Sequence, residues 1–141
     1  MYKVSLAIPI YNVSLFVERA LLSVLNQTYD NIEYLIVDDK GQDDSMDIVH
    51  RIIKDHPRGK DVRIIEHPYN IGLGATRNTA IDNAQGEYLF FMDSDDEIIP
   101  TCIEILVHKM QEHPVDFIAA SHMKKDLSGK TYPTYTYSPI L

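Results

Sequence analysis

An apolar run that ends in a dense acidic cluster constrains this chain more than any other feature. Residues 88–92 read YLFFM, and the next five residues, DSDDE, carry four carboxylates. The apolar run is typical of a buried strand, which would deliver the acidic cluster to one edge of a sheet. Carboxylates about 4 Å apart repel each other by about 4 kcal/mol at an effective dielectric near 20. We therefore expect a positive group beside this cluster.

The spacing of the acidic residues allows two interpretations. Side-chain alternation on an extended segment would place Asp93 and Asp95 on the same side, where their oxygens suit a hard cation such as Mg²⁺ or Mn²⁺. Alternatively, the cluster is a solvated turn that caps the next helix, because Asp96 and Glu97 precede Pro100, a residue that suits a first helical turn. Spacing alone does not decide between them.

Composition limits the class of protein. The chain has 141 residues, 45% of them hydrophobic, which is enough for one domain with a real core. A net charge of −8 argues against a nucleic-acid partner, because such surfaces need clustered Lys and Arg. The single cysteine, Cys102, has no internal partner, which fits a reducing compartment. Neither a signal-like start nor a membrane-length apolar run occurs, so we expect a cytoplasmic protein.

Strands and helices alternate along the predicted chain. Apolar runs predict strands at 4–8 (ended by Pro9), 33–37, 62–65, 88–92 and 115–120. Helical spacing predicts one helix after a Ser14 N-cap, one over 48–53, one that ends at Gly86 and one that starts at Pro100. This order predicts an α/β fold with a mainly parallel sheet and helices on both faces.

Ligands of such folds bind outside the carboxyl ends of the strands. The segments expected there are 9–12, 38–39, 72–77 and 93–96, so the unusual stretches converge on one edge. They complement a nucleoside diphosphate: a metal on Asp95, with Asp93 beside it, would neutralise charge on a departing diphosphate. Arg77, near a glycine-rich helix start, could reach the same phosphates, or could simply pair with Asp82 or Glu66.

The other two segments could hold the base. Tyr11 offers an aromatic face, and Asp38 or Asp39 could accept a hydrogen bond from a base imide N–H or from ribose hydroxyls. Asn12 could equally be a turn residue, and 43–45 could simply begin a helix. The six histidines show no repeated ligand spacing, so we expect them to be structural or surface groups.

Five ordered motifs resemble family 2 glycosyltransferases of the GT-A fold, over the N-terminal half of that family. The motifs are VSLAIPIYN (4–12), LLSVLNQTY (21–29), EYLIVDD (33–39), NIGLGATRN (70–78) and GEYLFFMDSDD (86–96). The resemblance implies a donor site in which Pro9, Tyr11 and Asn12 lie along the base and ribose, Asp39 with Asp38 at the base, and Arg77 near the diphosphate. Asp93 and Asp95 match the family's Asp-x-Asp motif, with Asp95 as the direct metal ligand and Asp93 at the ribose or a metal-bound water.

The implied activity is metal-dependent, inverting transfer from a nucleoside-diphosphate sugar to a hydroxyl acceptor in polysaccharide or glycan synthesis. UDP is favoured because the family uses it most often. The acceptor would be a glycan or lipid-linked glycan, with the whole protein at the inner face of a membrane. The base and acceptor site of this family usually lie well beyond the Asp-x-Asp motif. We therefore expect a GT-A domain over 1–126, an irregular tail over 127–141 cut before the acceptor part, and a catalytic base beyond Leu141.

One residue departs from the family pattern, and rival functions exist. Lys40 stands where a small or polar residue is common, and it could pair with Asp38 or Asp43 or alter base or phosphate contacts.

A binding module or inactive fragment with the same fold is the main rival. A phospho-acceptor receiver domain should carry its acidic pair after the first strand, and a nucleotidyltransferase should carry a basic, glycine-rich loop there. The sequence also lacks a dinucleotide fingerprint and a phosphate loop of the P-loop type.

Overall fold

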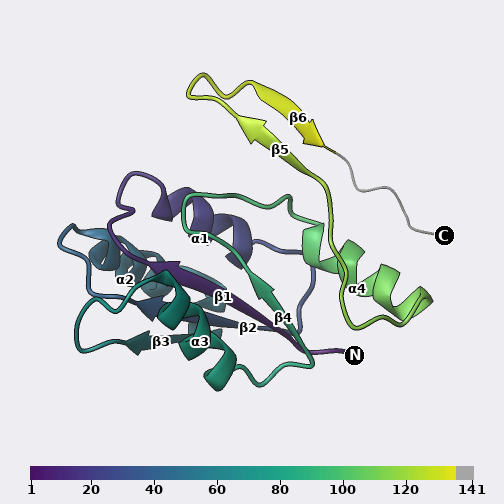
Figure 1. The fold of residues 1–141 in the computed structure, drawn as a ribbon, viewed down its shortest axis with the longest axis horizontal. Helices are drawn as coiled ribbons and strands as arrows, with labels where there is room; N and C mark the ends of the chain where they lie inside the picture. Colours follow the sequence, from purple (N-terminus) through teal and green to yellow (C-terminus); the bar gives the residue numbers. More distant parts are fainter. Residues whose placement is uncertain (136–141) are drawn as a thin grey trace. The chain divides into compact units, whose positions relative to one another are not determined.

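The computed structural model describes residues 1–135, with side chains through residue 132, as two compact units divided after Ile103. Its elements are β1 (Val4–Ile10), α1 (Val17–Leu25), β2 (Ile32–Asp38), α2 (Ser45–Asp55), the short 3₁₀ helix η1 (Pro57–Asp61), β3 (Val62–Glu66), α3 (Leu73–Asn83), β4 (Tyr88–Phe91), α4 (Cys102–Glu112), β5 (His122–Lys125) and β6 (Thr131–Tyr135) (Figure 1). The two units are described separately.

The first unit is built on a four-stranded parallel sheet in the order β3-β2-β1-β4. Right-handed crossovers place α1 and α2 on one face and α3 on the other, because the chain reverses its direction across the sheet between β3 and β4. The predicted parallel sheet with helices on both faces is thus confirmed. The strand order changes direction between β1 and β4, and ligands of open α/β sheets bind at such a point.

The core lies on both faces of the two central strands. All of β2 and all of β1 except Pro9 are buried, as expected for strands covered on both sides. On one face Ala7, Leu35 and Val37 pack with Ala80 of α3. Side-chain alternation turns their neighbours, such as Leu6, toward the face that α1 and α2 cover.

Pro9 lies inside β1, although the sequence predicted that the strand would stop there. In a parallel sheet the N–H and C=O groups of one residue point toward the same neighbouring strand. The Ala7 carbonyl points toward β4, because it accepts from Met92 N–H. Pro9, two residues on, faces that same side, where pairing has already ended at Phe91. Its missing N–H therefore breaks no ladder bond, and β1 continues to Ile10 beside Asp38.

Two predicted helix ends differ from the structure. Ser14 is not the N-cap of α1, because it lies in a turn closed by Val17 N–H on the Val13 carbonyl, and its own N–H binds Asp43. Gly86 is not the C-cap of α3, which is Ala84. Gly86 instead packs against β1, where an added Cβ would lie 2.7 Å from the Lys3 carbonyl oxygen.

The second unit contains an antiparallel hairpin of β5 and β6. The strand predicted at 115–120 is wrong: its residues form no strand in the described part of the chain, and Phe117 is 81% exposed. An apolar run makes a strand only where a neighbour offers a ladder, and no ladder reaches this one. β6 begins inside the segment 127–141 that we expected to be irregular. The boundary after residue 126 stays a prediction, and residues 136–141 lie outside the described part.

No helix among the described residues has the length and apolar character needed to cross a bilayer.

Candidate functional site

A cavity of about 460 Å³ opens at the switch point between the carboxyl ends of β1 and β4. It is lined by the end of β1, by the loops that follow β1, β2, β3 and β4, and by the start of α3: Pro9, Tyr11, Val13, Asp39, Asn70, Gly72, Leu73, Thr76, Asp93, Ser94 and Asp95. We call it the large cavity. Five residues predicted for the donor site, Pro9, Tyr11, Asp39, Asp93 and Asp95, therefore share one cavity.

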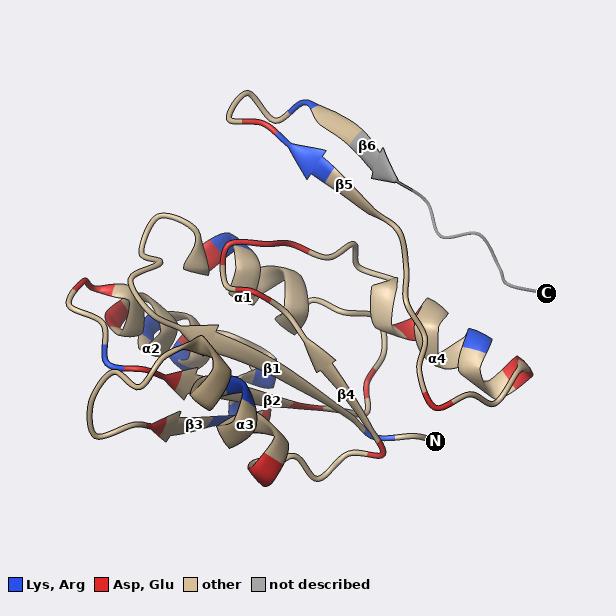
Figure 2. Cartoon of the chain, viewed as in Figure 1, with Lys and Arg blue, Asp and Glu red and all other residues tan. Residues whose placement is uncertain are grey.

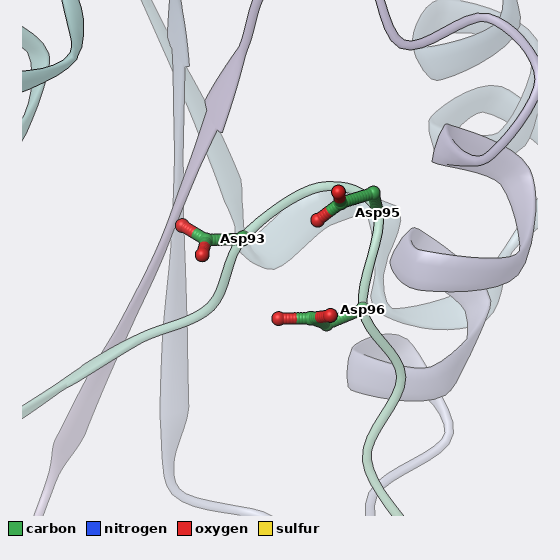
Figure 3. Close-up of side chains that lie close together, drawn as sticks. All are labelled: Asp93, Asp95 and Asp96. Carbon is green, nitrogen blue, oxygen red and sulfur yellow. The ribbon is translucent and has the colours of Figure 1, made fainter. Parts of the chain in front are cut away.

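The acidic residues after β4 form a turn rather than an extended segment. β4 ends at Phe91, and Asp96 N–H donates to the Asp93 carbonyl at 3.1 Å. The turn brings one carboxylate oxygen each of Asp93, Asp95 and Asp96 within 4.8 Å of one another (Figure 3). All three side chains are exposed. Strand alternation was thus the wrong reason for the proximity of Asp93 and Asp95, and the turn adds Asp96 to the group.

The three exposed carboxylates could hold a divalent cation, and they also agree with the solvated acidic turn that the sequence left open. Three carboxylates that converge offer the hard oxygen ligands that Mn²⁺ and Mg²⁺ take. Only the helix-capping part of that alternative is contradicted, because α4 begins at Cys102 and Glu104 is the acidic residue of its first turn.

The positive groups expected beside the acidic cluster are two arginines. Arg77 Nη2 of α3 lies 3.3 Å from Asp93 Oδ1, and Arg19 Nε of α1 lies 3.2 Å from Glu97 Oε1. Figure 2 shows how much of the loop after β4 is acidic. Arg77 is therefore at the acidic cluster and not paired with Asp82 or Glu66, the alternatives considered from the sequence. Its side chain is half-exposed, so the ion pair by itself adds little stability.

Asp39 is the most constrained of the predicted site residues. Its carboxylate is buried and accepts from Ile71 N–H at 2.9 Å, from Gly72 N–H at 3.0 Å and from His67 Nδ1 at 2.8 Å. Burial by itself would raise the pKa of Asp39, but these hydrogen bonds and the His67 ring outweigh it and hold the pKa below its usual range. The carboxylate thus fastens the loop before α3 to the end of β2.

Asp38 and Asn12 line a different, smaller cavity of about 200 Å³ beside Tyr11. Asp38 Oδ1 accepts from Lys40 N–H, and Lys40 Nζ lies 3.8 Å from Asp38 Oδ2 and 2.7 Å from Glu66 Oε2. Asn12 Oδ1 accepts from Gln42 N–H at 2.7 Å, so its side chain joins the loops after β1 and β2. Of Asp38 and Asp39, the two residues predicted to contact the base, only Asp39 lines the large cavity.

The hydrogen bonds among residues 43–45 support the prediction that this acidic stretch begins a helix. Asp43 Oδ1 accepts from Ser45 N–H at 3.0 Å and from the Ser45 hydroxyl at 2.6 Å, at the start of α2. These residues therefore begin a helix.

Sequence reasoning missed His67. It follows β3 directly, is 6% exposed, and bridges Asp39 and the Thr79 hydroxyl through its two ring nitrogens. Spacing could not have found it, because its partners lie 28 and 12 residues away on other elements. The one signal was its place at the carboxyl end of a predicted strand.

Comparison with known proteins identifies the family. The family model for glycosyl transferase family 2 matches residues 5–139. A glycosyltransferase of Haemophilus influenzae is 33% identical over 96% of this chain and 53% of its own length. A Campylobacter jejuni protein, GalNAc(5)-diNAcBac-PP-undecaprenol beta-1,3-glucosyltransferase, is 31% identical over 92% of this chain and 43% of its own length.

Solved structures agree. Staphylococcus aureus TarS (residues 1–349), solved in complex with UDP, is similar with a TM-score of 0.72 and 28% identity, over 79% of this chain and 32% of TarS. A Pyrobaculum calidifontis mannosyltransferase shares the fold, with a TM-score of 0.71 and 23% identity, over 89% of this chain and 36% of that one.

The chain belongs to glycosyl transferase family 2 and has the GT-A fold, as its motifs indicated. Membership of this family sets aside the receiver-domain and nucleotidyltransferase alternatives. The chain spans about half or less of the length of the relatives described above.

Proposed function

We propose that this chain is the donor-binding part of a metal-dependent, inverting glycosyltransferase that uses a nucleoside-diphosphate sugar, with UDP as the first nucleotide to test. One observation carries the proposal: Asp39 and Tyr11 line the same cavity as Asp93 and Asp95. A nucleoside diphosphate needs an aromatic side chain and a hydrogen-bond acceptor for its base, and metal ligands for its diphosphate. The base has an apolar face and polar edges, whereas the diphosphate is strongly anionic.

Different residues of the chain would bind different parts of the donor. Tyr11 would give the base an aromatic face, Asp39 would accept a base N–H, and Pro9 would lie along the base and ribose. Asn12 and Asp38, which line the small cavity, would act beside them by fixing the loops around Tyr11. Backbone N–H groups at the start of α3, which lines the large cavity, would suit the anionic part of the donor.

The acidic turn and Arg77 would handle the diphosphate. Asp95 and Asp93 would hold Mn²⁺ or Mg²⁺, which as a Lewis acid would neutralise charge on the departing diphosphate. Arg77 would move from Asp93 to a phosphate oxygen, since a guanidinium binds either anion. Manganese is the first ion to test, because the mannosyltransferase of the same fold was solved with GDP-Man and Mn²⁺.

The acceptor belongs to the proposal as well. The Campylobacter jejuni relative is named for an undecaprenol-linked glycan acceptor. We infer a glycan or lipid-linked glycan hydroxyl as acceptor, with the whole protein working at the cytoplasmic face of a membrane. We assign no catalytic base among residues 1–135, and we expect it beyond Leu141.

The main alternative is a domain that binds nucleotide without transferring sugar. Release of nucleoside diphosphate from UDP-glucose, UDP-GlcNAc and GDP-mannose, measured on the whole protein with Mn²⁺ and a hydroxyl acceptor panel, separates the two. Release that depends on an acceptor supports transfer. Nucleotide binding with no release supports the binding-only alternative, and the absence of both contradicts a donor site in this chain.

A further inference from the structure

Counting hydrogen bonds shows how few acceptor positions Asp39 has left. An ionised carboxylate offers about four lone-pair directions, two on each oxygen. Oδ1 accepts from Ile71 N–H and from His67 Nδ1, and Oδ2 accepts from Gly72 N–H. One acceptor position therefore remains, on Oδ2, and Asp39 lines the large cavity.

His67 is held from three sides. Its backbone N–H donates to the Asp38 carbonyl at 2.9 Å, its Nδ1 lies 2.8 Å from Asp39 Oδ1, and its Nε2 lies 2.8 Å from Thr79 Oγ1. Because an ionised carboxylate can only accept, Nδ1 carries the proton. The Thr79 hydroxyl also lies 3.0 Å from the Ala75 carbonyl within α3, so its one proton goes either to that carbonyl or to Nε2. The imidazole is thus a rigid link between α3 and the Asp39 carboxylate.

We propose that His67 is a positioning residue for recognition of the donor base: anchored by Thr79, it orients the Asp39 carboxylate so that the remaining acceptor position on Oδ2 selects a base that bears a ring N–H. This inference rests on the proposed function and names the feature that the donor's base must have. Uracil, thymine and guanine carry a ring N–H beside a carbonyl, whereas the corresponding nitrogen of cytosine is an acceptor. A carboxylate oxygen placed beside that cytosine nitrogen would set two acceptors against each other, so the site would disfavour cytosine.

Without the His67 link, Asp39 should lose its fixed direction. Oδ1 would keep one donor, the carboxylate could turn about its side-chain torsion, and the discrimination between bases would fall. General loosening of the fold would weaken all nucleotides alike. The affinity ratio between a nucleotide with a ring N–H and CDP is therefore a readout that a merely structural role would not move.

The experiment measures the affinity of the chain for UDP, GDP, dTDP and CDP by calorimetry with Mn²⁺. For the wild type we expect the tightest of the first three to exceed CDP by about tenfold or more, the effect of one hydrogen bond to a charged group. His67→Phe keeps a ring of similar size but removes both nitrogens, and we expect this ratio to fall to about twofold. His67→Asn keeps an N–H close to the Nδ1 position and should restore most of the ratio.

Two further variants complete the design. Thr79→Val removes only the far anchor of the ring, so it tests the same link if His67→Phe does not fold, and its ratio should also fall. His108→Asn, at an exposed position of α4, is the control for loss of a histidine and should behave as wild type. A wild-type preference that survives unchanged in His67→Phe, or in Thr79→Val if His67→Phe does not fold, would overturn this inference alone. A folded wild type that binds none of the four nucleotides would overturn the proposed function and this inference with it.

Discussion

Asp39 and Asp38 show how two adjacent residues of one type take different roles. Asp39 is tied to the loop before α3 and lines the large cavity, whereas Asp38 is tied to Lys40 and lines the small one. The sequence left both open as the base-recognition residue, because neighbouring residues at the end of a strand differ only in the direction of their side chains. Only the three-dimensional contacts separate them.

The lowered pKa of Asp39 predicts a pH-dependent contribution to stability. A carboxyl whose folded pKa lies below its ordinary value of 3.8 stabilises the fold above that value and loses the contribution as pH falls through the folded pKa. At pH 6 we expect Asp39→Asn to cost about 1–3 kcal/mol of unfolding free energy, since it removes a buried hydrogen-bonded charge. The gap between wild type and variant should narrow below pH 3.8, as urea unfolding at several pH values would measure. A gap that is constant with pH would contradict this.

Gly86 predicts a strong local effect of adding one methyl group. A Cβ there would lie 2.7 Å from Lys3 O and 2.7 Å from Ser5 N, which are backbone atoms of or beside β1. Gly86→Ala should therefore destabilise the chain by about 1–3 kcal/mol, the usual cost of overpacking. Gly74→Ala is the matched control, because nothing lies within 4 Å and the position is helical, so it should be neutral or stabilising. Equal stability of the two variants by urea unfolding would refute this account of Gly86.

At the scale of elements, apolar patterning predicted the first four strands and the helices around them. Their interiors were predicted well because burial on both faces demands continuous apolar runs. Their ends were predicted less well, because Pro9, Ser14 and Gly86 take roles set by neighbouring strands and loops rather than by local preference. The apolar run at 115–120 was wrongly predicted to be a strand for a related reason, since its residues pair with no strand in the described part of the chain.

β2 should be the element least tolerant of truncated side chains. Leu35 is fully buried and packs in the cluster that Ala80 of α3 completes. Leu35→Ala should cost about 2–5 kcal/mol of unfolding free energy, from lost burial and the cavity left behind. Leu15→Ala, at an 88% exposed position, should change stability by less than about 0.5 kcal/mol. A Leu35→Ala variant as stable as Leu15→Ala in urea would mean that the sheet packs differently from this description.

At the scale of the whole molecule, sequence alone predicted the parallel sheet and the edge at which Pro9, Tyr11, Asp39, Asp93 and Asp95 meet. Parallel strands must bring their carboxyl ends to one edge, so the acidic and glycine-rich loops had to meet. The division into a large and a small cavity, the turn that brings Asp96 beside Asp93, and the His67 link depend on side-chain directions. Those directions are fixed by contacts between elements far apart in the chain, which periodicity does not encode.

The measurement that tests the central claim most directly is calorimetric titration of the chain with UDP, GDP and dTDP, with and without Mn²⁺. We expect one of them to bind at least about tenfold more tightly with the metal, and this gain to be lost in Asp95→Asn, because the acidic turn would hold the ion between carboxylates and phosphates. Asp82→Asn, on the exposed surface of α3, makes the same change of charge and should keep the gain. Equal affinity with and without Mn²⁺, unaltered in Asp95→Asn, would contradict the metal site. A folded chain that binds none of the three would contradict the donor site itself.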